Sequence, residues 1–126
     1  MINLVVLHVV LTRPASQLDL PSGTRIAAME VTVRRQGAPA EPVPVSWTDP
    51  PSWVTSADTG TEVVVLGRVR RRFFRSGGAT QSRTEVVAAR VVRASSRAKV
   101  AALMAEAVHC LESRDATVRP GGVERL

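Results

Sequence analysis

Aromatic side chains are scarce in this chain of 126 residues, which has two Trp, two Phe and no Tyr. It also has a single cysteine, Cys110, which excludes an internal disulfide framework and is compatible with a cytoplasmic protein. One cysteine and two histidines do not assemble a zinc site within a short span. The sequence shows no nucleophile–base pair, no paired carboxylates in one segment and no phosphate-binding Gly-Lys-Ser/Thr loop. We therefore expect neither an enzyme nor a bound cofactor or metal.

A hydrophobic run long enough to cross a bilayer is also missing. Residues 1–11 are apolar but too short to span, and they lack the basic start and small-residue cleavage site of a signal peptide. We expect no membrane association and interpret this segment as a buried strand. At 13.5 kDa the chain has room for one hydrophobic core and one appendage.

Positive charge is abundant and unevenly distributed. The formal net charge is +6, from 17 basic and 11 acidic residues. Residues 67–99 hold ten of the basic residues and one acidic residue, which gives this segment a net charge of +9. Sixteen of the 17 basic residues are Arg, whose guanidinium makes forked contacts to phosphate and stacks on bases. The distribution indicates a polyanionic partner, with nucleic acid favoured over a membrane surface.

The most informative stretch is a long predicted strand, residues 62–75. Strand alternation places three arginines and a phenylalanine on one face, and it places valines and the neighbouring phenylalanine on the other. We expect the first set to point outward, where it could contact phosphates and stack a base: Arg68, Arg70, Arg72 and Phe74. We expect the second set to lie in the core: Val65, Val69 and Phe73. The alternative is a solvated edge strand that its arginines keep soluble.

Four more strands are predicted by β-branched and alternating segments at residues 2–11, 25–35, 43–47 and 82–92. A short helical linker within residues 48–60 precedes the long strand, and Ser76-Gly77-Gly78-Ala79 forms a hairpin turn after it. Five strands with a helical linker between the third and fourth is the order of an oligonucleotide/oligosaccharide-binding (OB) barrel. The predicted fold is therefore all-β: a five-stranded OB barrel with an added C-terminal helix.

Beyond Arg93 the period of the apolar residues changes to that of a helix. One stripe is formed by Val100, Leu103, Met104, Ala107, Val108 and Leu111. This stripe must be buried against its own barrel, a second subunit or a protein partner. We predict three units: an OB domain over 1–93, an amphipathic helix over 94–116 and a flexible tail over 117–126.

Four segments resemble a known family. They are Ile2-Asn3 with Val5-Val6-Leu7 and Leu11-Thr12-Arg13, then Pro21-Ser22-Gly23-Thr24, Gly67-Arg68-Val69-Arg70 and Thr84-Glu85-Val86-Val87-Ala88. In this order and spacing they resemble bacterial single-stranded DNA-binding proteins (SSB) along residues 1–93. The resemblance implies an OB fold, a dimer or tetramer built partly through the first strand, and sequence-tolerant binding of single-stranded DNA (ssDNA). It implies no catalysis, and it suggests a cytoplasmic, nucleoid-associated protein of DNA replication, repair or recombination.

The resemblance also assigns roles to single residues. Phe74 matches a base-stacking aromatic at the end of the fourth strand, and Trp47 matches one in the third strand that faces the DNA path. For Trp47 a subunit contact is equally compatible with the sequence. Arg68, Arg70 and Arg72 would follow the DNA backbone. The arginines that flank the loops are further candidates for phosphate contacts: Arg34, Arg35, Arg75 and Arg83.

The chain also departs from the family. The loop at residues 34–42 is short and contains no aromatic residue, and the usual Gly-rich tail with an acidic tip is absent. A second hypothesis is therefore an OB-fold interaction or oligomerisation module that has lost strong ssDNA binding and binds a protein partner through its C-terminal helix. RNA is a third option, because stacking and phosphate contacts serve either polymer.

Overall fold

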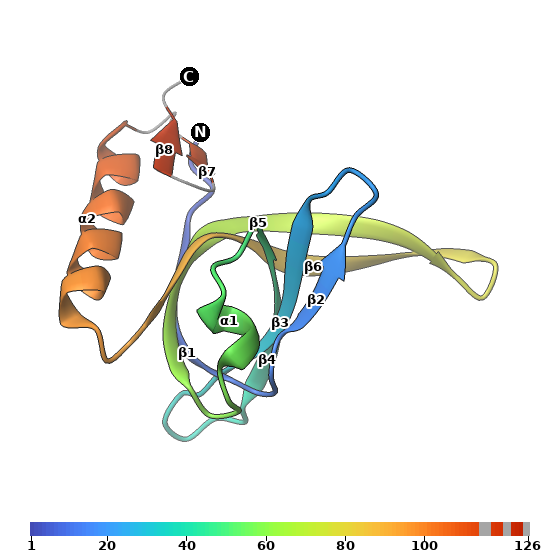
Figure 1. Ribbon diagram of the computed structural model, residues 1–126, viewed down its shortest axis with the longest axis horizontal. Coiled ribbons are helices and arrows are strands. Elements are labelled where there is room, and N and C mark those ends of the chain that lie inside the picture. The colour runs from blue at the N-terminus through green and yellow to red at the C-terminus, as the bar shows by residue number, and fades with distance from the viewer. Residues whose placement is uncertain (114–116, 120–121, 125–126) are drawn as a thin grey trace.

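The fold is a closed β-barrel, seen in a computed structural model that describes residues 1–113, 117–119 and 122–124 (Figure 1). Six strands form one sheet in the order β1-β5-β6-β4-β3-β2, and an additional pairing of β1 with β3 closes five of them into the barrel. The strands are β1 (Val5–Leu11), β2 (Ser16–Asp19), β3 (Arg25–Val33), β4 (Glu41–Thr48), β5 (Glu62–Ser76) and β6 (Ala79–Arg93). The predicted five-stranded OB barrel is confirmed.

Two short elements complete the barrel. Helix α1 (Trp53–Ser56) lies in the predicted linker before β5 and buries Val54. Strand β2 pairs with β3 at the edge of the sheet and was not predicted from the sequence. Its four residues are all exposed, so it lacks the alternation of a half-buried strand, and prolines on both sides favoured a loop.

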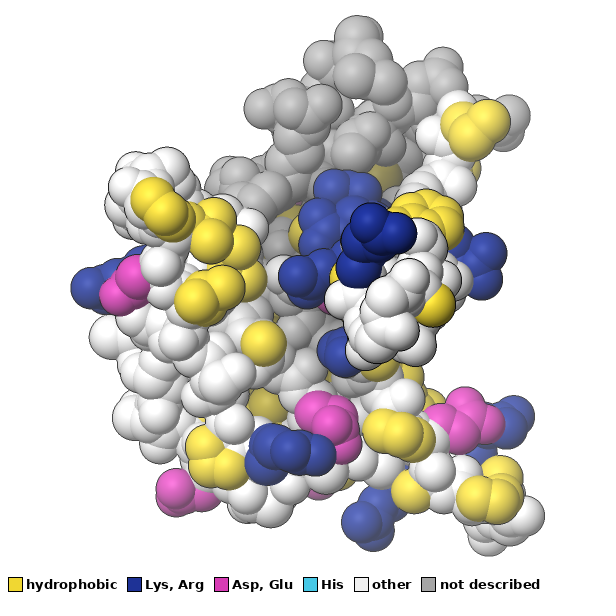
Figure 2. Space-filling view, turned by 90° about the vertical axis from the view of Figure 1, so that its right-hand side faces the viewer, with side chains coloured by type: hydrophobic (Ala, Val, Ile, Leu, Met, Phe, Trp, Pro, Cys, Tyr) yellow, Lys and Arg dark blue, Asp and Glu magenta, His cyan; other side chains and the backbone are white. Residues whose placement is uncertain are grey.

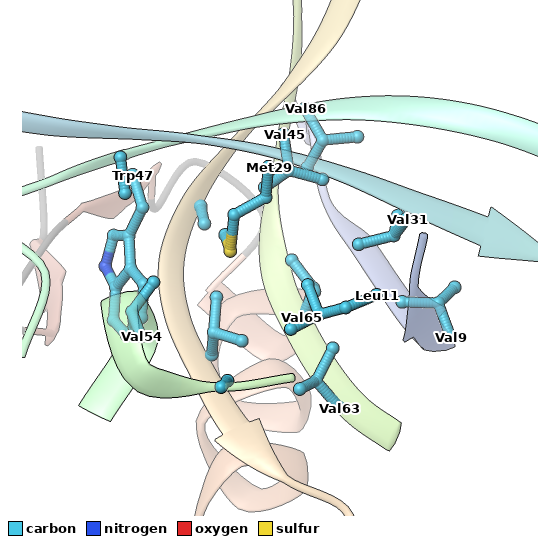
Figure 3. Close-up of a cluster of buried hydrophobic side chains, with 14 residues drawn as sticks. Val9, Leu11, Met29, Val31, Val45, Trp47, Val54, Val63, Val65 and Val86 are labelled. Carbon is cyan, nitrogen blue, oxygen red and sulfur yellow. The ribbon is translucent and has the colours of Figure 1, made fainter. Parts of the chain in front are cut away.

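The main core fills the inside of the barrel (Figure 3). Val63 and Val65 of β5 point into it and are fully buried, as the alternation of that strand predicts. Trp47 of β4 lies in the same cluster beside Val54 of α1. Since both faces of β5 are apolar between Val63 and Leu66, a second layer must cover the outside of the barrel here.

Helix α2 (Arg97–Ser113) provides that second layer. Its Leu103, Ala107 and Cys110 are buried against the outer face of β5 and β6, where they meet Val64, Leu66 and Ala89. The other half of the predicted stripe stays uncovered in the single chain: Met104, Val108 and Leu111 are each about half exposed. The helix therefore docks on its own barrel with one half of its apolar surface only.

Beyond α2, two short strands pair with each other: β7 (Thr117–Arg119) and β8 (Gly122–Glu124). Residues 117–119 and 122–124 lie within the segment predicted as a flexible tail, and they form a small antiparallel hairpin whose β7 contacts β5 and β6. The rest of that segment lies outside the described residues. Within the described part of the chain, no helix has both the length and the apolar character needed to cross a membrane.

Candidate nucleic-acid interface

Strands β5 and β6 continue beyond the barrel as a projecting two-stranded hairpin (Figure 1). At its base, Asn3 exchanges two hydrogen bonds of 2.8 Å with the backbone of Val69, and β4 pairs with β6 at Val86–Ala88. From Arg70 to Glu85 the two strands pair only with each other, and we call these residues the arm. The arm contains five arginines and one glutamate, which gives it a net charge of +4.

A β-bulge lies where β5 and β6 leave the barrel. Leu66 is paired with Arg90 but Gly67 with Ala88, so Ala89 is an extra residue on β6. Gly67 is required at this point, because a Cβ atom there would collide with the carbonyl of Val87. Bulges bend a strand and increase its twist, which is the change of direction that an arm leaving a closed barrel needs.

The arm has two faces, and the strand register assigns every side chain to one of them. The outer face continues the side of β5 that α2 covers, and it carries Arg70, Arg72 and Phe74 opposite Glu85, Arg83 and Gln81. The inner face continues the lining of the barrel, and it carries Arg71, Phe73 and Arg75 opposite Thr84, Ser82 and Thr80. Phe74 is 37% exposed and Phe73 is 66% exposed.

The predicted parity of β5 is therefore right, but the predicted burial of its second half is wrong. Val65 is buried as expected, whereas Val69 is 43% exposed and Phe73 lies in solvent. The reason is that the barrel ends near Gly67, so the inner face has no opposing layer beyond it. The polar run of β6 opposite Phe73 (Thr80, Ser82 and Thr84) is the sequence signal that could have revealed this.

Not all arginines of the outer face are available to a ligand. Arg70 donates hydrogen bonds to Oε1 of Glu85, whose side chain is only 4% exposed. This ion pair neutralises Arg70 and leaves it a weaker candidate for phosphate than the sequence indicated. Arg68, just before the arm, is partly buried beside Val87.

Arg72 and Arg83 are directly opposite each other on neighbouring strands. Like charges at such a position destabilise a sheet unless a counter-charge is present. The four arginines of the arm other than Arg70 form no ion pair with any residue that the structure describes. Looking toward the tip of the arm, Figure 2 shows Lys and Arg side chains gathered around it on more than one side.

Trp47 does not lie on an exposed DNA path, contrary to that part of the prediction. Its side chain is 6% exposed and packs edge-on against Trp53, with 6.3 Å between the ring centroids. The guanidinium of Arg93 in turn lies 4.8 Å from the centre of the Trp53 ring. Because strand β4 ends next to α1, the Trp47 side chain packs into the core at that point and does not face outward.

Arg34 and Arg35 are not brought together with the arm. They lie in the loop between β3 and β4, which Figure 1 shows far from the arm tip. Arg35 forms a 3.1 Å ion pair with Glu41, and Arg34 lines a shallow hollow beside His8 and Glu62. Arg75 and Arg83, the other two loop-flanking candidates, both belong to the arm.

A larger hollow of about 720 Å³ lies between α1, the end of β6 and the start of α2. Its basic side chains are partly engaged within the protein, because Arg93 contacts Trp53 and Arg90 pairs with Glu106. Among the residues that the structure describes, no group of His, Cys, Asp and Glu side chains could hold a metal ion. The arm, by contrast, brings together four arginines that form no ion pair with the residues the structure describes.

Comparison with known proteins gives a fold but no sequence family. No protein-family model matches the chain, and no curated protein sequence matches it. Among solved structures, the chain is similar to the wild-type single-stranded DNA-binding protein from Thermus aquaticus, with a TM-score of 0.61 and 22% sequence identity. The match covers 73% of this chain and 40% of that one, so the chain spans less than half the length of the protein it resembles. The likeness supports the OB fold.

Proposed function

We propose that this protein binds single-stranded DNA with little dependence on sequence, and that the arm is its main contact surface. The observation that carries the proposal is the pair Arg72 and Arg83, which face each other without a described counter-charge next to the exposed Phe74. Two guanidiniums and a ring on one strand surface can hold two phosphates and stack one base. The resemblance in fold to an ssDNA-binding protein is consistent with this.

The proposed contacts have distinct energetic signatures. Each phosphate contact with a single strand adds about 0.7 to the slope of log affinity against log salt. Stacking of one base on an aromatic ring contributes about 1–3 kcal/mol and does not depend on salt in this way. With both tryptophans engaged in the core region, two phenylalanines remain for stacking, so we expect binding to depend strongly on salt.

A titration of fluorescent oligo-dT at several salt concentrations tests the proposal. Arg72→Ala/Arg83→Ala should lower the salt slope by about 1.4, since two phosphate contacts are lost. The matched control is Arg97→Ala/Lys99→Ala, which removes two exposed positive charges from the start of α2 and should leave the slope unchanged. The proposal fails if the wild type does not bind oligo-dT at about 50 mM salt, where phosphate contacts are strongest.

Several finer features belong to the same proposal. We infer a non-catalytic role in DNA replication, repair or recombination, in the cytoplasm and close to the nucleoid. We also infer a homo-oligomer, a dimer or a tetramer. Strand β1 supports this inference, because it pairs with β3 only at Val10 and Leu11 and leaves the edge of residues 5–9 open among the described residues.

A second candidate function is favoured by α2. Its uncovered apolar stripe, Met104, Val108 and Leu111, could bind a protein partner or a second copy of the chain. In that case the protein would be an OB-fold interaction module, and the arm would contribute little. The oligo-dT titration separates the two functions, because a module of this kind would bind ssDNA weakly even at low salt.

A further inference from the structure

We propose that the arm binds two separate segments of ssDNA, one on each face, and that the protein thereby promotes pairing of complementary strands. This inference rests on the proposed function and extends it from holding one strand to joining two. It starts from an equivalence between the two faces. Each face carries two arginines without a described ion-pair partner and one exposed phenylalanine: Arg72, Arg83 and Phe74 outside, and Arg71, Arg75 and Phe73 inside.

The single acidic side chain of the arm accounts for this equivalence. Glu85 lies on the outer face, where it neutralises Arg70 alone. Without that pair the outer face would carry three free arginines against two on the inner face. With it, each face presents the same number of guanidiniums and the same number of rings. The two faces therefore have similar capacity for a short stretch of nucleotides.

No arm residue belongs to either core cluster of the described residues, and the one buried side chain of the arm is that of Glu85 at its base. Helix α2 packs against residues near the barrel end of β5 and β6, such as Val64, Leu66 and Ala89. Figure 1 shows α2 and the β7–β8 hairpin at that end, while the arm projects away from them. Both phenylalanines of the arm are therefore accessible to a ligand, one on each face.

One strand of DNA cannot satisfy both faces at the same level of the arm. Successive side chains of a β-strand point to opposite sides, and layers packed on the two sides of a sheet lie about 10 Å from it. The hairpin backbone therefore separates a phosphate bound at Arg72 from one bound at Arg71. Two separate segments of ssDNA fit this arrangement, each neutralised by its own arginines.

The tip of the arm allows two such segments to meet. It consists of Ser76, Gly77, Gly78 and Ala79, and both glycines have positive φ angles of 61° and 81°. These residues have small side chains or none, so they place little bulk between strands that run past the tip. The arm's positive charge also reduces the repulsion between the two DNA backbones. Complementary segments held in this way can form base pairs just beyond the tip.

Energy transfer between two labelled strands tests the inference. Donor-labelled and acceptor-labelled oligo-dT, which cannot pair with each other, are mixed with the protein. Transfer should be strongest when strands outnumber copies of the protein, and it should fall in protein excess as the strands distribute over separate copies. A second assay follows the annealing of complementary mixed-sequence oligonucleotides, which the wild type should accelerate.

Two matched variants identify the faces. The outer-face variant is Arg72→Ser/Arg83→Ser/Phe74→Ser and the inner-face variant is Arg71→Ser/Arg75→Ser/Phe73→Ser. Each should still bind one strand, more weakly and with a salt slope lowered by about 1.4. Each should reduce both the energy transfer and the acceleration of annealing, because each arm then holds one strand instead of two. Because all six side chains are exposed, unfolding temperatures close to that of the wild type are expected.

The outcomes separate this inference from the function on which it rests. If the wild type binds oligo-dT but shows no energy transfer, ssDNA binding stands and the two-faced arm is refuted. If both variants bind oligo-dT and keep wild-type transfer, the two strands are joined by association of protein copies and not by the arm. If the wild type binds no oligo-dT, both the function and the inference fail.

Discussion

Glu85 limits the positive charge that the arm offers to a ligand. It is the one buried acidic side chain among the described residues, and it occupies both Nε and a terminal nitrogen of Arg70. We predict that Glu85→Gln frees Arg70 and raises the salt slope of oligo-dT binding by about 0.7, the contribution of one phosphate contact to a single strand. Affinity at low salt should rise with it.

The control for this prediction is Glu41→Gln, which releases Arg35 from an exposed ion pair far from the arm. A slope that rises equally in both variants would show that general charge, and not Arg70, is responsible. Loss of the Arg70 pair should cost some stability, because a buried carboxylate gives way to an amide without a full partner. Thermal unfolding measures that cost separately.

For single residues, the sequence predicted which face of a strand each side chain occupies more reliably than whether that face is buried. The alternation of β5 placed Arg72 and Phe74 on one side and Phe73 on the other, as the structure shows. It could not show that the barrel ends near Gly67, because that depends on how far β1 and β4 extend along their partners. The prediction that Trp47 faces the DNA failed for a related reason. Strand β4 ends next to α1, and the Trp47 side chain fills the core at that point.

Helix α2 has one buried and one exposed apolar stripe, and the two should respond differently to truncation. Leu103 is 1% exposed and Leu111 is 48% exposed. We predict that Leu103→Ala lowers the free energy of unfolding by about 2–5 kcal/mol, the usual range for a buried leucine. Leu111→Ala serves as the matched control and should change it by less than about 0.5 kcal/mol in the monomer. Equal effects measured by urea unfolding would contradict the docking seen here.

The elements themselves were largely predictable, with instructive exceptions. A nearly continuous apolar run located β1, β-branched and alternating segments located β3, β5 and β6, and the 3.6-residue period located α2. Strand β2 was missed because it is held by backbone pairing with β3 and buries none of its side chains. The apolar stripe of α2 was predicted as one surface. The angle at which α2 docks on the barrel, however, buries one side of the stripe and exposes the other. That angle depends on tertiary packing at Ala89, which no local pattern encodes.

For the whole molecule, the free edge of β1 and the uncovered stripe of α2 are the surfaces that a second copy could use. We predict that Met104→Asp/Leu111→Asp lowers the mass measured by analytical ultracentrifugation, because charged side chains oppose burial of the stripe. The matched control is Glu112→Lys, a charge change at an exposed position of the same helix. An unchanged mass for the double variant would restrict any oligomer contact to other surfaces.

The Gly67 bulge also determines how the arm can change in length. From Arg70 to Glu85 the two strands pair only with each other, so residues can be added within the arm without altering the register of the barrel. Two residues added to each strand would lengthen the arm by about 6.6 Å and return every later side chain to its original face. One residue added to each strand would exchange the faces, moving Phe74 inward and Phe73 outward. Insertions in even steps are therefore the changes of length that such a hairpin tolerates, which makes its reach adjustable in increments of two residues.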